Sequence, residues 1–216
     1  MPKSSPYIFG IGPPKSGSHS LAIALEMLGI KTVHTGRVMG ESGRASGVKL
    51  QDDLSAALAA AADNYTADLF AGIPAVANVS AIVDWPIWNN FRTIDRCIPD
   101  AKFILTYRNP DDCAFSWARQ VSRQPQLWAS PHADYDVFLR VIRSLYSSVS
   151  NYFLRRPDKL LFLTSNVPGT ENIKALAHFL DVPVPDNVSD YPTAFKHQTW
   201  HTACQAKKTD IAGKKI

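Results

Sequence analysis

Cysteine is scarce in this 216-residue sequence, and long apolar runs are missing. The three cysteines, Cys97, Cys113 and Cys204, are widely separated and form no C-x-x-C pair. This argues against a disulfide framework or a zinc site and favours a reducing compartment. No run approaches the roughly 20 apolar residues that span a bilayer, and the N-terminal residues lack the core of a secretory signal. We therefore expect a cytoplasmic protein with no metal site and no stable membrane insertion.

Charge is also sparse. Lysine and arginine total 23, aspartate and glutamate total 19, and the formal net charge is +4. So weak a bias suits an anionic small molecule and argues against a nucleic-acid partner. No period persists along the chain, which excludes a coiled coil or a repeat array. With 45% apolar residues, the chain is expected to form a single domain over residues 1–216, with a loosely ordered basic tail at about 201–216.

What the sequence does contain is an alternation of short apolar runs and helical patterns. The clearest run is Lys102–Tyr107, and the clearest amphipathic helix spans residues 134–153. Further strands are expected at residues 7–11, 31–34, 75–83 and 160–163, and further helices at 18–28, from 52 or 53 to 70, at 86–98, from 111 onward and at 172–180. Strands that alternate with helices predict an α/β protein, a three-layer sandwich whose central parallel sheet is flanked by helices.

A loop rich in glycine, proline and serine joins the first expected strand to the first expected helix. It reads Gly12-Pro-Pro-Lys-Ser-Gly-Ser-His-Ser20. An α/β protein presents backbone N–H groups and the positive end of a helix dipole at such a junction. Gly17 lets a ligand approach the backbone closely, and Lys15 and the serines add donors. The loop is therefore a candidate cradle for phosphate or sulfate, and the alternative is a proline-rich turn with a serine cap on the helix.

The loop differs from the Walker A motif of nucleotide-hydrolysing enzymes. In that motif the lysine follows the last glycine, whereas Lys15 precedes Gly17. The best inner strand also leads into Arg108, which places positive charge where a magnesium-binding carboxylate is expected. Both features argue against an NTPase.

A second candidate anion site lies much further along the chain. Arg108 follows the strand Lys102–Tyr107, and Ser116 lies about two turns into the next expected helix. The planar guanidinium matches phosphate oxygens and the hydroxyl adds a directional donor, so the two can converge on one anion. The alternative is an arginine that caps neighbouring carbonyl groups beside a surface serine. Either segment alone predicts anion binding only weakly, and the two together make the prediction specific.

These segments resemble the sulfotransferase family. Pro14-Lys-Ser-Gly-Ser-His-Ser-Leu21 is similar to the loop by which sulfotransferases hold the 5′-phosphosulfate of PAPS (3′-phosphoadenosine 5′-phosphosulfate), with His19 in place of the usual threonine. Arg108 and Ser116 are similar to the element that binds the 3′-phosphate. The segments Asp84-Trp-Pro and 99–108 look most like a compact branch of this superfamily.

The resemblance spans about residues 8–191 and implies a P-loop NTPase-like sulfotransferase fold. It also implies PAPS as the co-substrate and PAP, its desulfated form, as the product. The donor-binding residues that it implies are Pro14, Lys15, Ser16, Gly17, Ser18, His19, Ser20, Arg108 and Ser116.

Sulfuryl transfer requires charge stabilisation on the leaving phosphate and a base for the acceptor proton. Lys15 is the candidate for the first role, and no metal is required when lysine, arginine and a helix terminus surround the anion. For the base, the resemblance points to Asp84 at the end of an expected strand. The alternative role of Asp84 is to cap the helix expected from residue 86. His34 and Glu41 are rival bases.

The sequence therefore predicts a PAPS-dependent sulfotransferase that acts on a hydroxyl or amine of a small-molecule, lipid or glycan acceptor. Two alternatives stay open: a nucleotide-kinase-like phosphotransferase, and a non-catalytic nucleotide-binding protein on the same scaffold. Trp85, Trp88, Trp117 and Trp128 are candidates for an aromatic wall around adenine or an apolar acceptor, and core packing accounts for most such residues. The fold does not determine which acceptor is used.

Overall fold

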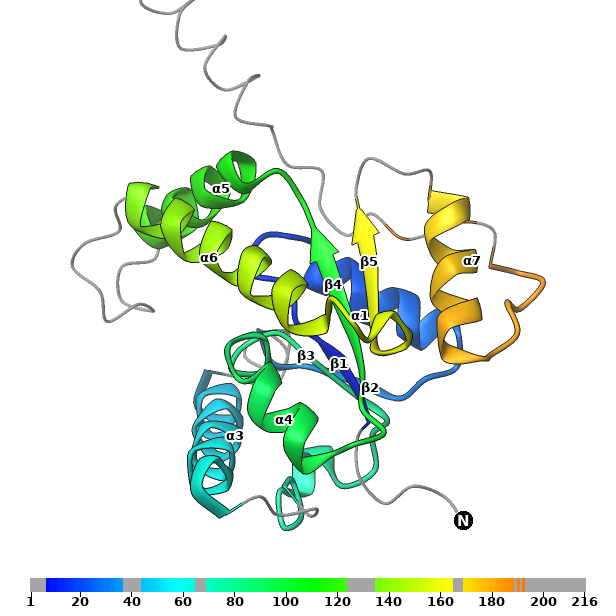
Figure 1. The fold of residues 1–216 in the computed structure, drawn as a ribbon, viewed down its shortest axis with the longest axis horizontal. Coiled ribbons are helices and arrows are strands. Elements are labelled where there is room, and N and C mark those ends of the chain that lie inside the picture. Colours follow the sequence, from blue (N-terminus) through cyan, green and yellow to red (C-terminus); the bar gives the residue numbers. More distant parts are fainter. Residues whose placement is uncertain are drawn as a thin grey trace, which may run out of the picture.

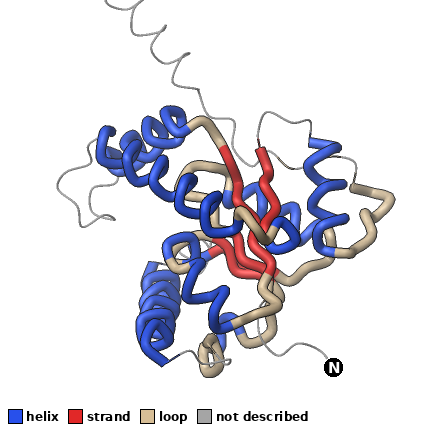
Figure 2. Tube along the Cα trace, in the orientation of Figure 1, coloured by secondary structure: helices blue, strands red, loops and turns tan. Residues whose placement is uncertain are grey.

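A parallel β-sheet forms the centre of the molecule (Figure 1; Figure 2). The computed structural model describes residues 7–36, 44–64, 69–123, 135–164, 169–188, 190 and 192. Within these residues the sheet has five strands in the order β2-β3-β1-β4-β5, and each pairing is parallel. The strands are β1 (Ile8–Gly10), β2 (Thr32–His34), β3 (Ala81–Val83), β4 (Lys102–Tyr107) and β5 (Leu160–Thr164). The expected α/β architecture with a parallel sheet is confirmed.

Six α-helices in the described part of the chain cover the two faces of the sheet. They are α1 (Ser18–Met27), α3 (Arg44–Asn64), α4 (Phe91–Cys97), α5 (Pro110–Arg123), α6 (Tyr135–Phe153) and α7 (Gly169–Leu180). Helices α1 and α7 share a core with Ile8 and Ile104, whereas the other four share a core with Phe9 and Phe103. Because successive side chains of a strand point to opposite faces, each inner strand supplies both cores.

The segment after β3 departs from the helix expected over residues 86–98. It forms a 3-10 turn, η2 (Ile87–Asn89), and then the separate helix α4. The backbone N–H of Ile87 donates to the Asp84 carbonyl at 2.9 Å, and that of Asn90 donates to the Ile87 carbonyl at 3.0 Å. These are the short-range bonds of a 3-10 turn, and Asn90, with φ −119°, ends it.

Two other boundaries also differ from expectation. The strand expected over residues 75–83 is confined to β3, because a 3-10 turn, η1 (Pro74–Val76), occupies its first part. Helix α3 begins at Arg44, well before the start expected at residue 52 or 53. Leu50, Leu54 and Leu58 lie at helical spacing in the core, and their burial outweighs the cost of about 1 kcal/mol for a glycine inside a helix.

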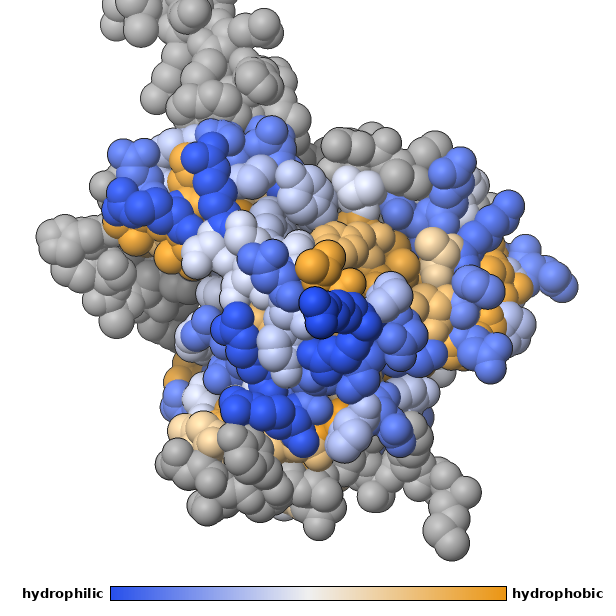
Figure 3. Space-filling model, in the orientation of Figure 1, coloured by the Kyte–Doolittle hydropathy of each residue, from blue (hydrophilic) through white to orange (hydrophobic). Residues whose placement is uncertain are grey.

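The edge of the sheet at β5 is partly uncovered. Phe162 of this strand is 48% exposed, and in Figure 3 a hydrophobic area lies over β5 among mostly hydrophilic residues. Leu160 and Leu163 of this strand are buried, whereas Leu161, Phe162 and Thr164 are more exposed, as expected for an edge strand.

Some expectations from the sequence concern residues outside the described part, namely Glu41, Trp128, Cys204 and the tail at 201–216. Cys97 and Cys113 are buried and not in a disulfide. Across the segments that the structure describes, none of the helices combines the length and the apolarity needed to cross a membrane.

A buried carboxylate joins α4 to the segment after α6. Asp95 accepts hydrogen bonds from Arg156 Nη1 at 2.5 Å, from Lys159 Nζ at 2.6 Å and from the Tyr152 hydroxyl at 2.9 Å. Lys159 belongs to a 3-10 turn, η4 (Pro157–Lys159), that leads into β5. Burial alone would raise the pKa of Asp95, but the hydrogen bonds from Lys159, Arg156 and Tyr152 hold it below its usual range. The ionised carboxylate therefore links α4 to the end of α6 and to the turn η4 that precedes β5.

We expect the Asp95→Asn variant to lose about 2 kcal/mol of unfolding free energy at neutral pH, since two cationic groups lose their anionic partner. Because folding lowers the pKa of Asp95, its contribution is present above the ordinary aspartate pKa of about 3.9 and is lost as the pH falls through the lower folded-state value. Urea unfolding at neutral and acidic pH measures both effects. The exposed Asp158→Asn is the control, and a stability of Asp95→Asn equal to wild type would contradict the role of the cluster.

Candidate functional site

The loop after β1 is fastened to β4 through Ser16. The Ser16 hydroxyl donates to the Pro13 carbonyl at 2.6 Å and lies 2.7 Å from the Thr106 hydroxyl of β4. A Cβ at Gly12 would lie 1.8 Å from Thr106 Oγ1 and 2.5 Å from Ser16 Oγ, so a larger residue does not fit there. The Ser16 side chain is thus engaged in holding the loop. The sequence analysis predicted no role for Thr106. The one feature that marks it in the sequence is a polar side chain within an otherwise apolar strand.

Helix α1 begins at the end of this loop without a side-chain cap. Its N-cap is Gly17, with φ 116° and no side-chain hydrogen bond, and its first turn holds no acidic residue. The alternative of a serine-capped turn is therefore wrong. A Cβ at Gly17 would meet nothing within 4 Å, so the backbone borders open space at the positive end of the helix. Lys15 also adopts a positive φ of 70°, a conformation that non-glycine residues rarely adopt outside functional loops.

Arg108 reaches this loop from the end of β4. Its Nη1 donates to the Lys15 carbonyl at 3.4 Å. The backbone of Arg108 is held by Tyr146 of α6, whose hydroxyl accepts from the Arg108 N–H and donates to its carbonyl, each at 3.2 Å. The two candidate anion sites of the sequence therefore meet, although 93 residues separate them. Tyr146 lies on the buried stripe of an amphipathic helix, where a tyrosine hydroxyl needs a partner, and this is the one sequence signal for it.

Lys15 lies within the electrostatic field of both Asp84 and Arg108. Burial lowers the pKa of the Lys15 ammonium, the Asp84 carboxylate opposes this shift, and the Arg108 guanidinium adds to it. The net pKa is below the ordinary value of lysine. A cation that is partly removed from water and next to another cation is stabilised by an incoming anion, because the anion offsets both the burial and the repulsion.

Asp84 and His34 lie side by side at the ends of β3 and β2. The strand register pairs His34 with Val83, and His34 Nε2 lies 3.7 Å from Asp84 Oδ2 and 3.1 Å from the Ser18 hydroxyl of α1. A Cβ at Gly36 would lie 2.8 Å from Asp84 Oδ2. The structure thus brings the two candidate bases together with one serine of the loop. The side chain of Asp84 is 18% exposed and that of His34 is 7% exposed, so the carboxylate is the more accessible group.

The alternative role of Asp84 as a helix cap does not occur. The turn η2 has Pro86 as its N-cap residue and α4 has Asn90, and neither end has a side-chain cap hydrogen bond. Asp84 instead has a φ of 87°, which turns the chain sharply after β3. Its carboxylate is therefore left facing His34 and Lys15.

The contacts of the remaining residues say less about a role in the site. Ser116 is half-buried in α5 and makes no hydrogen bond to Arg108 in the described residues. Asn109 caps α5, since its side-chain oxygen accepts from the Asp111 N–H at 2.8 Å. Among the tryptophans, Trp88 and Trp117 belong to the core, whereas Trp85 is 40% exposed. Within the described ranges no group of three or more His, Cys, Asp or Glu side chains could hold a metal ion.

Comparison with known proteins assigns the chain to a family. The family described as "Sulfotransferase domain" matches residues 7–161, which include β1 to β4 and every described candidate residue of the site. The chain belongs to the sulfotransferase domain family. The family implies a transferase that uses a sulfonate donor and an acceptor substrate. A comparison with curated proteins gave no match.

One solved structure agrees with this family at the level of the fold, and a second is less similar. The sulfotransferase domain of the Synechococcus PCC 7002 olefin synthase is similar with a TM-score of 0.51 and 15% identity, covering 100% of this chain and 98% of that one. A sulfotransferase from Alicyclobacillus acidocaldarius gives a TM-score of 0.48 and 14% identity, covering 96% of this chain and 93% of that one. The first of these supports the sulfotransferase fold expected from the sequence.

The electrostatic setting of Lys15 in this sulfotransferase is testable without any ligand. We expect Asp84→Asn to lower the pKa of Lys15 further, because the carboxylate opposes the effect of burial, and Arg108→Gln to raise it. The pH dependence of Lys15 acetylation, followed by mass spectrometry with exposed Lys31 as the internal reference, measures the pKa. An unchanged Lys15 pKa in both variants would show that the charges of Asp84 and Arg108 do not act on the Lys15 ammonium.

The two glycines of the loop are expected to respond differently to alanine. Gly12→Ala forces a methyl group onto Thr106 and Ser16 and should cost about 3 kcal/mol of unfolding free energy. Gly17→Ala has space for the methyl group and should cost about 1–2 kcal/mol, through backbone conformation alone. Thermal and urea unfolding compare the two, and equal losses would contradict this packing of Gly12 against β4.

Proposed function

We propose that this sulfotransferase binds PAPS in the loop at residues 14–20 and transfers its sulfuryl group to a hydroxyl or amine of an acceptor. The observation that carries the proposal is the convergence of Lys15, Arg108 and the uncapped N-terminus of α1. A guanidinium, an ammonium and a helix terminus together form a strong site for a multiply charged phosphate ligand.

Each residue has a distinct part in the proposed reaction. Lys15 and the N–H groups at the start of α1 stabilise the charge that develops on the leaving phosphate as the bond from sulfur to the phosphate oxygen breaks. Arg108, with Ser116 two turns into α5, binds the second phosphate and fixes the nucleotide along the edge of the sheet. Asp84 accepts the proton of the acceptor as the new bond to sulfur forms.

His34 is assigned a positioning role beside Asp84. Its Nε2 lies within hydrogen-bond distance of Ser18 and close to the carboxylate, and it is the less accessible of the two candidate bases. His34 thereby links the loop that holds the donor to the residue that receives the proton. Glu41, the third candidate base, lies outside the described residues.

The donor site is tested by isothermal titration with PAP. We expect wild type to bind, and Lys15→Ala and Arg108→Ala each to weaken the affinity by about tenfold or more, because each removes a charged hydrogen-bond donor. Lys49→Ala is a matched control, since Lys49 is exposed and paired with Asp53. Arg143→Ala serves likewise, because Arg143 pairs with Asp111 on the surface. Absence of PAP binding at millimolar ligand would overturn the proposal.

Asp84→Asn then separates an enzyme from a non-catalytic binder. In the proposed enzyme this variant retains PAP binding but loses acceptor-dependent release of PAP from PAPS, measured over a panel of phenols, alcohols and amines. Binding of PAP by wild type with no turnover on any acceptor would favour the non-catalytic alternative. Magnesium-dependent binding of ATP in preference to PAP would favour a phosphotransferase.

A further inference from the structure

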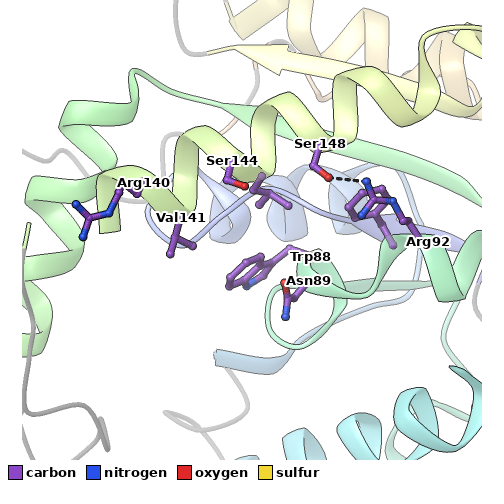
Figure 4. Close-up of a pocket in the computed structure, with 9 residues that line it drawn as sticks. Trp88, Asn89, Arg92, Arg140, Val141, Ser144 and Ser148 are labelled. Atoms are coloured by element: carbon purple, nitrogen blue, oxygen red, sulfur yellow. Dashed lines mark hydrogen bonds between the residues drawn. The ribbon is translucent and has the colours of Figure 1, made fainter. Parts of the chain in front are cut away.

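An open groove of about 370 Å³ runs between α6 and the segment η2–α4. Figure 4 shows Val141 and Ser144 of α6 on one side of it and Trp88 on the other, with Ser148 bonded to Arg92. The groove lies within the size range of ligand sites in proteins. Its lining combines an aromatic ring and aliphatic side chains with hydroxyl and amide groups. Such a surface suits a small amphipathic molecule better than a purely apolar one.

Two arginines give the groove a positive charge. Arg140 and Arg92 lie toward opposite ends of it (Figure 4). Arg92 is held in place, since its Nη2 donates to the Ser148 hydroxyl at 2.7 Å and its guanidinium lies 5.0 Å from the centroid of the Phe91 ring. Neither arginine forms an ion pair with a carboxylate in the described residues. A fixed guanidinium without an anionic partner is suited to bind an oxyanion.

Two tryptophans link the groove to the segment that carries Asp84. Asp84 is followed directly by Trp85, and the Trp85 and Trp88 rings pack edge to face with centroids 5.4 Å apart. Trp85 is partly exposed, whereas Trp88 forms part of the wall of the groove. The exposed Trp85 ring next to Asp84 therefore packs on Trp88, which is mostly buried and presents only a small part of its surface to the groove. Rings of this kind bind aromatic or flat apolar groups by stacking and edge contacts.

We propose that this groove binds the acceptor, and that the acceptor is a hydroxylated aromatic compound with a carboxylate at its far end. The inference rests on the function proposed above and adds the class of acceptor to it. The hydroxyl lies at Asp84, the ring lies against Trp85 and Trp88, and the carboxylate pairs with Arg92. Arg140 contributes longer-range attraction from the other end of the groove. A phenol suits a carboxylate base, because phenols lose their proton more readily than aliphatic alcohols.

The test uses para-hydroxyphenylalkanoates of increasing chain length and their primary amides, which match them in shape but carry no charge. Binding is measured by titration calorimetry on the full chain, with and without PAP. We expect wild type to bind at least one carboxylate about five- to tenfold more tightly than its amide, as one charged hydrogen bond at a solvent-accessible site allows. The difference should shrink as the salt concentration rises.

Variants assign this preference to the groove. Arg92→Gln should abolish the difference between carboxylate and amide, and Arg140→Gln should reduce it by a smaller factor. Arg143→Gln is the matched control: it removes the same charge from α6, but Arg143 pairs with Asp111 and does not line the groove. Arg140 is exposed and forms no hydrogen bond in the described residues, so Arg140→Gln keeps the test valid if Arg92→Gln folds poorly.

The outcomes separate this proposal from the donor site. All three variants should bind PAP with wild-type affinity, because none touches the loop or Arg108. Equal affinity of wild type for carboxylates and amides, or a preference that persists in both Arg92→Gln and Arg140→Gln, would overturn the acceptor class while leaving PAP binding intact. Absence of PAP binding by wild type would overturn the donor assignment. The titrations without PAP would still measure whether the groove binds the carboxylate more tightly than the amide.

Discussion

The contact between Ser16 and Thr106 joins residues that are 90 positions apart in the chain, and the geometry of the site depends on it. Strands β1 and β4 are parallel neighbours, so their carboxyl ends lie at one edge of the sheet. The contact holds the loop after β1 against β4 at that edge. Arg108, two residues beyond Thr106, then reaches the Lys15 carbonyl. Sheet pairing brings the segments together, and the two hydroxyl groups fix how the loop lies.

The charges at this edge restrain one another. Lys15 is partly buried and close to Arg108, which disfavours its charged form, whereas Asp84 favours it. Asp84 in turn lies near His34, and His34 contacts Ser18 of α1. The ends of β1, β2, β3 and β4 each contribute to this network, which is the arrangement that parallel α/β sheets provide for ligand binding. Each strand end supplies only one of the charged or titratable side chains, so the site forms only where the four ends meet.

The sequence predicted the parts of this structure that follow from local pattern. The apolar runs predicted the strands, and the structure brings the loop Gly12–Ser20 and Arg108 together at a strand-to-helix junction. That an anion binds there stays a prediction. Contacts made only in the folded chain escaped prediction. Tyr146 holds the backbone of Arg108 from 38 residues away, and Thr106 is a polar residue in a buried strand whose partner lies in another segment. The early start of α3 and the 3-10 turn at Ile87–Asn89 reflect packing and turn geometry that outweigh local propensity.

Helix α6 carries two kinds of contact on different sides. Tyr146 holds both backbone polar groups of Arg108, while Ser144 and Ser148 line the groove. These residues lie on one helix, so a displacement of α6 would move both the support of Arg108 and the lining of the groove. Thermodynamic linkage makes such an influence mutual. A coupling that this helix carried between ligands bound on its two sides would therefore act equally in both directions.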